Sequence, residues 1–348
     1  MQGTRCRHSL LVFVLWLAGL GLSLAGDFED ATIMHIDYPD WFKETFLDLP
    51  DEIDEARSAG KVGLMVLFTT EGCSYCAEFI RTSLADARLA ERVQARFDAI
   101  GLEIFSDAEM VAPDGSQLRV KEFAERAGAG FAPSLVFYGE DGALLYRGVG
   151  YHSPERFASV LDYLSGPQQA GQSFRDFVVA RSAEHSSAPA DYRLLSDPLF
   201  SPPPFALDRS RMPADRPLLV LFEADGCEAC GQMHKEVLAR PEVRELLGRF
   251  EVVRLDAEDD ETPVLTPGGR RTTAAAWFAQ TGLTRLPALL FFEEHGQEVL
   301  RTDALVLRQR MMNALMYTLE RAYQKGWTYQ RFARTKSLER SQRDNGQD

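Results

Sequence analysis

The chain has 348 residues, of which 45% are hydrophobic. This length suffices for about two domains of ordinary size, each with its own core. The formal net charge of -14 argues against the basic, phosphate-binding surface that nucleic-acid-binding proteins carry. The composition therefore predicts two globular units and no nucleic-acid partner.

Residues 1–25 have the features of an export signal. Arg5 and Arg7 precede an uncharged apolar run at residues 10–24, and Ala25 is a small residue placed for cleavage. The run is shorter than the ~20 apolar residues that a membrane-spanning helix needs. We therefore expect a cleaved signal peptide and a periplasmic mature chain. The alternative is an uncleaved segment that anchors the protein to the membrane.

After the signal, the patterns predict strands and helices in alternation. An apolar run at Leu64–Phe68 has the length of a buried strand, and apolar residues at helical spacing follow it. A second strand is expected at Phe97–Ile104, a helix around Phe123, and a strand, turn and strand after Pro133. A helix at Phe157–Leu164 closes the unit. The order β-α-β-α-β-β-α predicts an α/β domain with a central mixed sheet flanked by helices.

The same pattern recurs 154 residues later. The segments LMVLFTTEGCSYC and LLVLFEADGCEAC align without a gap, and FAPSLVFY aligns with LPALLFF further along. The coinciding landmarks include Cys73 with Cys227, Cys76 with Cys230, and Pro133 with Pro287. Such an ordered set of matches indicates two copies of one domain, which we place at residues 40–181 and 199–333.

A segment that contains prolines separates the copies, and a polar segment follows them. Because proline fixes φ and removes a backbone donor, residues 182–198 are predicted to form an extended linker, with extended character to about 217. The charged tail at residues 334–348 is expected to be disordered.

Four of the five cysteines form two Cys-x-x-Cys pairs. A bond within so short a loop stabilises little, so chemistry explains these pairs better than structural stapling. Cys73 and Cys227 each precede a predicted helix, whose N-terminal N–H groups and dipole favour the attacking thiolate. They are the expected nucleophiles. Cys76 and Cys230 are the expected resolving cysteines, which close the internal disulfide.

Pro133 and Pro287 each lie 60 residues after an expected nucleophile and open a strand. An ordinary proline at the start of a strand is one interpretation. Its recurrence at one distance from both cysteine pairs favours a cis peptide bond after Ala132 and after Leu286. Such a bond would turn a strand edge toward the backbone of a substrate. These four residues are therefore the predicted substrate-binding positions.

The motifs GCSYC (72–76) and GCEAC (226–230), each with its downstream proline, resemble the active sites of the thioredoxin superfamily. The FAPSLVFY and LPALLFF segments and the aromatic domain ends are similar to those of SoxW-type periplasmic thioredoxins. The resemblance covers most of residues 40–181 and 199–333. It implies two tandem thioredoxin-like domains that exchange disulfides with exported proteins. It also implies recharging by a membrane thiol transporter of the DsbD or CcdA type, with the redox-active disulfides in place of a cofactor.

The chain departs from thioredoxin at the buried acid. Leu67 and Leu221 occupy the position of the thioredoxin aspartate, six residues before the first cysteine. Glu71 and Asp225 lie near the motifs and are the alternative acids for this role, but we expect them to be solvated. The sequence therefore assigns no residue to the deprotonation of the resolving cysteine.

The dipeptides between the cysteines also differ, with Ser-Tyr in the first motif and Glu-Ala in the second. The carboxylate of Glu228 disfavours the thiolate of Cys227. We therefore predict that the second domain is the more reducing and passes electrons to the first.

A metal site is one alternative, because Cys227, Cys230 and His234 form the pattern C-x2-C-x3-H. The first copy has Ile80 where the histidine would fall. Since the ligand set is missing from one copy, we expect no metal and a histidine on the helix surface.

Two further alternatives concern function. A non-catalytic module would use the fold to hold client peptides, but it would not need both cysteines in both copies. The direction of exchange is also open. Reduction of disulfides in periplasmic proteins is the expectation, and isomerisation or oxidation is the alternative.

Overall fold

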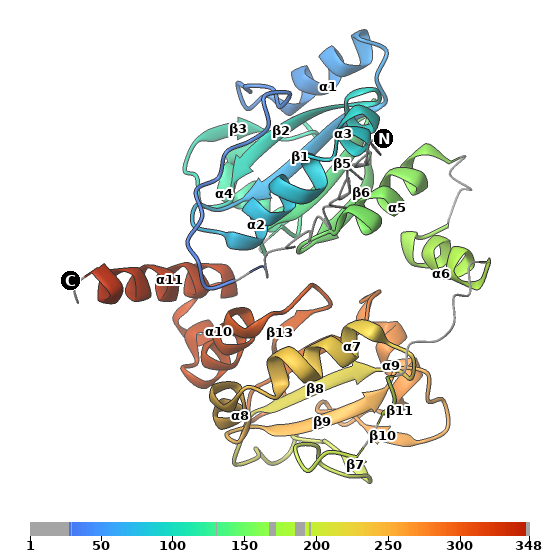
Figure 1. Cartoon of the computed structure of the whole chain (residues 1–348), viewed down its shortest axis with the longest axis vertical. Helices are drawn as coiled ribbons and strands as arrows, with labels where there is room; N and C mark the ends of the chain where they lie inside the picture. The colour runs from blue at the N-terminus through green and yellow to red at the C-terminus, as the bar shows by residue number, and fades with distance from the viewer. Residues whose placement is uncertain are drawn as a thin grey trace, which may run out of the picture.

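The computed structural model describes residues 28, 30–129, 131–166, 172–184, 192–194 and 196–345. The predicted signal at residues 1–25 lies outside the described residues. Figure 1 shows two domains, one above the other, joined through α6 (Phe174–Glu184). In the part of the chain that the structure describes, no helix is long and apolar enough to cross a membrane.

The first domain is built on a sheet with strand order β2-β1-β5-β6. The central strand β1 runs parallel to β2 and antiparallel to β5, and β5 pairs with β6 in antiparallel fashion. The strands are β1 (Gly63–Thr69), β2 (Phe97–Glu103), β5 (Ser134–Gly139) and β6 (Leu144–Val149). A hairpin of β3 (Glu109–Val111) and β4 (Gln117–Arg119) lies outside this sheet. The helices are α1 (Leu49–Ser58), α2 (Ser74–Phe79), α3 (Ala87–Gln94), α4 (Val120–Arg126) and α5 (Pro154–Ser165), with a π-helical turn at Ile80–Leu84.

The second domain repeats this plan with strand order β13-β12-β8-β9. Its strands are β8 (Leu218–Glu223), β9 (Glu251–Asp256), β12 (Ala288–Phe292) and β13 (Glu298–Thr302). Its helices are α7 (Glu228–Met233), α8 (Pro241–Leu247), α9 (Ala274–Thr281), α10 (Arg308–Leu319) and α11 (Tyr329–Asn345), with a π-helical turn at His234–Leu238 and a 3-10 turn at Ala322–Lys325. A small sheet joins β7 (Phe205–Ala206), β10 (Pro263–Leu265) and β11 (Arg271–Thr273). Both domains confirm the predicted α/β class with mixed sheets flanked by helices.

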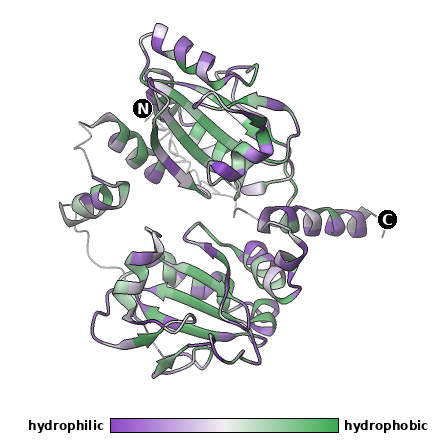
Figure 2. Cartoon of the chain, turned by 180° about the vertical axis from the view of Figure 1, so that it is seen from behind, coloured by the Kyte–Doolittle hydropathy of each residue, from purple (hydrophilic) through white to green (hydrophobic). Residues whose placement is uncertain are grey.

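Each central strand is buried on both faces, which explains its uninterrupted apolar sequence. In β1, Leu64, Val66 and Phe68 pack into one core cluster, whereas Met65 and Leu67 pack into the cluster on the opposite face. Figure 2 shows the strands of both sheets as largely hydrophobic. This packing on both faces fixes the ends of the strands, and the loops that carry the cysteines follow from these ends.

The extended character that we expected from residue 199 to about 217 was wrong, because part of this stretch packs against the second domain. Leu199 and Phe200 pack against the core of the second domain, and β7 pairs with β10. Arg209 is buried and lies 2.7 Å from the carboxylate of Glu251. Prolines permit this packing because a short edge strand uses only part of its backbone donors. Upstream, α6 extends to Glu184, and residues 185–191 and 195 lie outside the described residues.

The tail also differs from the expectation, because α11 continues through Asn345 where we expected disorder from residue 334. Tyr329 and Phe332 are buried against the second core, and Lys336 lies 2.9 Å from the carboxylate of Glu320. These contacts anchor the first turns, so the polar residues that follow extend a helix that is already nucleated. Residues 346–348 lie outside the described residues.

Contacts between the domains fix their arrangement. Arg285 of the second domain donates to the carbonyl of Val149 in the first at 2.9 Å, and it also pairs with Asp303. Gly150 has φ +83°, and a Cβ there would lie 2.3 Å from the Cβ of Ala304. This close approach therefore requires glycine.

His152, next to this contact, is fully buried. Its Nδ1 lies 2.8 Å from the carbonyl of Gly150, and its Nε2 lies 3.0 Å from the hydroxyl of Tyr146. Since the carbonyl only accepts, Nδ1 carries the proton and Nε2 accepts from the tyrosine. Burial, with the positive charges of Arg285 and Arg156, holds the pKa of His152 well below its ordinary value.

This histidine is expected to make the protein less stable in acid. The unfolded chain binds a proton at His152 below about pH 6.5 and the folded chain does not, so the free energy of unfolding falls as the pH decreases below that value. The slope approaches about 1.4 kcal/mol per pH unit. Urea denaturation between about pH 5 and pH 7.5 measures it. His152→Gln should remove this part of the slope, whereas His295→Gln, at an exposed position, should retain it. Equal slopes for both variants would contradict the assignment.

Candidate redox sites

The first cysteine pair lies where β1 gives way to α2. Gly72 adopts φ +81° in the connecting turn, which a residue with a side chain adopts only under strain. Cys73 caps α2, and its Sγ accepts the backbone N–H of Cys76 at 3.2 Å. The two sulfurs form a disulfide with a Cα–Cα distance of 5.3 Å. The predicted position of the first cysteine at a helix N-terminus is therefore observed.

The second pair has the same geometry. Gly226 adopts φ +74°, Cys227 caps α7, and its Sγ accepts the N–H of Cys230 at 3.1 Å. The pair forms a disulfide with a Cα–Cα distance of 5.2 Å. Two equivalent redox centres are thus present in one chain.

The peptide bonds Ala132–Pro133 and Leu286–Pro287 are both cis, as the repeat led us to expect. Strands β5 and β12 begin directly after the prolines. Ala132 is buried, whereas Leu286 is only half-buried and lines a groove with Pro287. The role of these residues in binding substrate stays a prediction.

Burial distinguishes the two centres. Every residue from Cys73 to Cys76 is buried, and Cys73 itself is 8% exposed. At the second centre Cys227 is half-buried, and the intervening Glu228 and Ala229 are exposed. The repeat predicts the shared scaffold, but it does not predict this difference in access.

The tyrosine of the first motif connects the first centre to the second domain. Tyr75 donates its hydroxyl to Asp30 at 2.8 Å and accepts the backbone N–H of Leu307 at 2.9 Å. Asp30 also accepts the N–H groups of Gln309 and Arg310, so its carboxylate faces the N-terminus of α10. Burial raises the pKa of Tyr75 well above its ordinary value. Tyr75 thus acts as a structural bridge.

A buried acid lies at the end of β8, four residues before Cys227, at a position that the sequence patterns did not indicate. Glu223, at the end of β8, is completely buried, and its carboxylate accepts the hydroxyl of Tyr192 at 2.7 Å. The Nε2 of His234 lies 2.9 Å from the same carboxylate, and the Nε of Arg254 lies 3.9 Å from it. Burial, followed by the bond to Glu223, raises the pKa of Tyr192. The available signal was an acid that continues the apolar run LLVLF.

The other predicted acids and the histidine have different surroundings. The side chains of Glu71 and Asp225 are 50% and 57% exposed, which agrees with the expectation that they are solvated. His234 is 21% exposed and faces Glu223, so the expected surface position was wrong. The reason is that Glu223 offers it a buried charged partner. Within the described ranges, no group of three cysteine, histidine or acidic residues is placed to hold a metal ion.

The comparisons with known proteins agree with this geometry. The family model of the thioredoxin-like domain matches residues 49–165 and 209–319. The chain belongs to the thioredoxin-like domain family. The two matches confirm the predicted superfamily and its duplication, while the SoxW-type resemblance stays a prediction. No curated protein matches the chain at a significant level.

Solved thioredoxin-fold structures are also similar to this thioredoxin-like chain. A thioredoxin-fold protein from Helicobacter pylori is 21% identical, with 41% of this chain and 89% of that chain covered and a TM-score of 0.33. A thioredoxin from Thermus thermophilus is 24% identical, with 35% and 86% covered and a TM-score of 0.28. The reduced DsbD C-terminal domain from Neisseria meningitidis is 20% identical, with 31% and 84% covered and a TM-score of 0.24.

Two thioredoxin-like domains, each with a Cys-x-x-Cys pair at a helix N-terminus, make the chain a thiol–disulfide oxidoreductase. The helix dipole and the N–H bonded to Sγ stabilise the thiolate in each centre. The redox-active groups are therefore the cysteines themselves.

Proposed function

We propose that this oxidoreductase is exported and reduces disulfides in periplasmic proteins. The observation that carries the proposal is the surface beside the second centre. There Ala229, between the cysteines, shares a groove of about 340 Å³ with Leu286 and Pro287. An extended substrate segment fits such a groove, and its disulfide would lie beside Cys227.

The reaction follows from the order of the two cysteines. The thiolate of Cys227 attacks one sulfur of the substrate disulfide, and the other substrate sulfur leaves as a thiolate and takes up a proton. The thiolate of Cys230 then attacks the Sγ of Cys227 and releases the second substrate sulfur. Two electrons pass to the substrate, and the Cys227–Cys230 disulfide forms.

The oxidised centre must then be reduced again. We propose exported proteins with disulfides as substrates and a membrane thiol transporter of the DsbD or CcdA type as the electron donor. The predicted signal peptide supports a periplasmic location, or a membrane-anchored one if the segment is retained. Isomerisation or oxidation would use the same cysteines with another redox partner.

Insulin reduction with dithiothreitol tests the catalytic role. The double variant Cys73→Ser, Cys227→Ser should fall to the uncatalysed rate, a loss of about 100-fold or more, because both attacking thiolates are removed. Each single variant reports the other centre. Unchanged activity in the double variant would contradict catalysis and favour a client-binding protein.

The two centres are expected to differ in reduction potential. A carboxylate in the motif disfavours the Cys227 thiolate, so the second centre should be the more reducing, by about 30 mV for a tenfold effect. Equilibration with glutathione buffers measures each potential in full chains that retain one cysteine pair. Equal potentials would remove the basis for electron transfer from the second domain to the first.

A further inference from the structure

We propose that the second domain closes the first redox centre to polypeptide substrates, and that this centre reacts with small disulfides that carry carboxylates. The closing element is the part of α10 and α11 that contains Arg310, Tyr329 and Gln330, called here the helical cap. The inference rests on the proposed disulfide exchange and names the substrate class of one centre.

The helical cap occupies the backbone groups that a substrate strand would need. The side-chain oxygen of Gln330 accepts the N–H of Ala132 at 3.1 Å. The guanidinium of Arg310 donates to the carbonyl of Ala132 at 3.1 Å. A peptide that adds as a strand beside Pro133 would form its hydrogen bonds with these same two groups. In this arrangement the second domain therefore takes the place of a polypeptide substrate.

Aromatic packing fills the adjacent space. The guanidinium of Arg310 lies 3.3 Å from the ring centroid of Tyr75 and 4.6 Å from that of Phe131. The ring of Tyr329 stacks on Phe131 with a centroid distance of 5.2 Å. All four side chains belong to buried residues, and the backbone of Arg310 is held by Asp30. Opening the cap would expose this apolar surface and break a buried polar network, so the closed state is favoured.

Among the described residues, none caps the second centre in this way. Within the described part of the chain, no hydrogen bond joins the backbone of Leu286 to another residue, although Leu286 is the counterpart of Ala132. The groove beside it is lined mainly by apolar residues, among them Leu305 and Val306. The second centre therefore retains the strand position that the first has lost.

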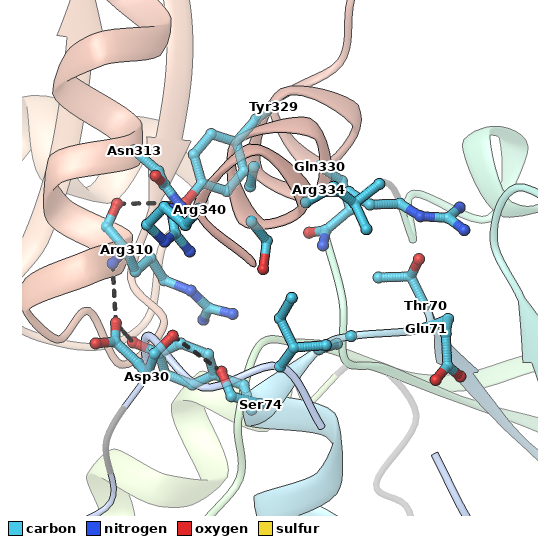
Figure 3. Close-up of a pocket in the computed structure, with 17 residues that line it drawn as sticks. Asp30, Thr70, Glu71, Ser74, Arg310, Asn313, Tyr329, Gln330, Arg334 and Arg340 are labelled. Carbon is cyan, nitrogen blue, oxygen red and sulfur yellow. Dashed lines mark hydrogen bonds between the residues drawn. The ribbon is translucent and has the colours of Figure 1, made fainter. Parts of the chain in front are cut away.

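A small pocket still leads to Cys73. It has a volume of about 120 Å³ and is lined by Cys73, Gly72, Arg310, Arg334, Leu338 and Arg340. An engineered cavity of about 150 Å³ holds benzene, so this smaller pocket has room for no more than one end of a small disulfide. Figure 3 shows Arg310 beside Asp30, to which its backbone N–H donates, and Arg340 on the helix of the second domain above them.

The charges around the pocket favour an acidic ligand. Both carboxylate oxygens of Asp30 already accept hydrogen bonds, and Glu71 lies 2.8 Å from a ring nitrogen of His35. Three arginines and two acids line the pocket, so positive charge is in excess there, and Arg310 and Arg334 also contact Ala132 and Glu103. Guanidinium groups bind carboxylates well because their donors match the two oxygens.

The reaction with a small disulfide R–S–S–R is balanced by the cysteine pair alone. The Cys73 thiolate attacks one sulfur, a Cys73–S–S–R bond forms, and the first RS⁻ leaves and takes up a proton. Cys76, once deprotonated, attacks the Sγ of Cys73 and releases the second RS⁻. The cysteine pair loses two electrons and becomes the Cys73–Cys76 disulfide, and R–S–S–R is reduced to two thiols.

The test uses full-length chains with one active centre each: Cys227→Ser, Cys230→Ser retains the first, and Cys73→Ser, Cys76→Ser retains the second. We expect the first centre to reduce insulin at least about 10-fold more slowly than the second. We also expect its rate ratio for oxidised glutathione over cystamine, which lacks carboxylates, to exceed that of the second centre by about 10-fold. Comparing ratios between chains cancels the intrinsic reactivity of each reagent.

Further variants of the chain that retains only the first centre test which residues cause its substrate preference. Arg334→Gln, Arg340→Gln should lower the glutathione-to-cystamine ratio several-fold, whereas Arg249→Gln, at an exposed remote position, should not change it. Gln330→Ala should increase insulin reduction several-fold, whereas the exposed Gln324→Ala should have no effect. The proposal would be overturned if both centres reduced insulin at the same rate, or if both had the same ratio of glutathione to cystamine rates. Failure of both chains to react with any disulfide would instead contradict the proposed function.

Discussion

Replacing Asp30 with Ala is expected to lower the free energy of unfolding by about 3–5 kcal/mol. The buried carboxylate accepts hydrogen bonds from the Tyr75 hydroxyl and from two backbone N–H groups of α10. The substitution leaves these three donors without their acceptor. The lost stability should come from a weaker contact between the two domains. We therefore expect denaturant unfolding to separate into two transitions, as each domain unfolds by itself.

Two control variants interpret this result. Asp30→Asn retains an oxygen that accepts hydrogen bonds and removes the charge, so it should cost less than Asp30→Ala. Asp37→Ala, at a carboxylate that is 85% exposed, should change the free energy of unfolding by no more than about 0.5 kcal/mol. A single transition with wild-type stability in Asp30→Ala would show that the bridge from Tyr75 to α10 contributes little.

The buried acid of the second domain should have an effect of similar size. Glu223→Ala removes the partner of Tyr192 and His234 and leaves their polar atoms buried, with an expected cost of about 3–5 kcal/mol. Glu223→Gln retains hydrogen bonds at the same position and should cost less. Chemical denaturation of the three proteins measures the difference.

Glu223→Gln should also shift the redox equilibrium. Glu223 lies four residues before Cys227, and a buried negative charge disfavours a nearby thiolate. Its removal stabilises the reduced centre, so the reduction potential should become more positive, by about 30 mV for a tenfold change in equilibrium constant. Glu245→Gln, at an exposed remote acid, should leave the potential unchanged. A potential that is insensitive to Glu223→Gln would leave the acid with a structural role only.

The sequence predicts the features that depend on local patterns. Uninterrupted apolar runs mark β1 and β8 because both faces of a central strand are buried. The cysteines directly after these runs therefore lie at the junction with a helix, as the structure shows. The repeat also singles out the two prolines, because the same spacing from both cysteine pairs is improbable by chance.

Features that depend on distant partners escaped the sequence patterns. Asp30 meets Gln309 and Arg310 across about 280 residues of chain, and no periodicity links these positions. Glu223 finds Tyr192 in a segment that its prolines led us to regard as an extended linker. The charged sequence of α11 is typical of a solvated tail, and Figure 2 shows that helix as largely hydrophilic. Only its first turns reveal why it is ordered, through Tyr329 and Phe332.

The bridge from Tyr75 to Leu307 has a consequence for the order in which the protein matures. Synthesis proceeds from the N-terminus, so the first domain emerges before α10 and α11. Until these helices fold, Ala132 lacks its hydrogen bonds to Gln330 and Arg310, and the first cysteine pair lacks its neighbours from the second domain. The newly made chain thus passes through a stage in which Cys73 is more accessible to oxidants, and folding of the last helices ends that stage.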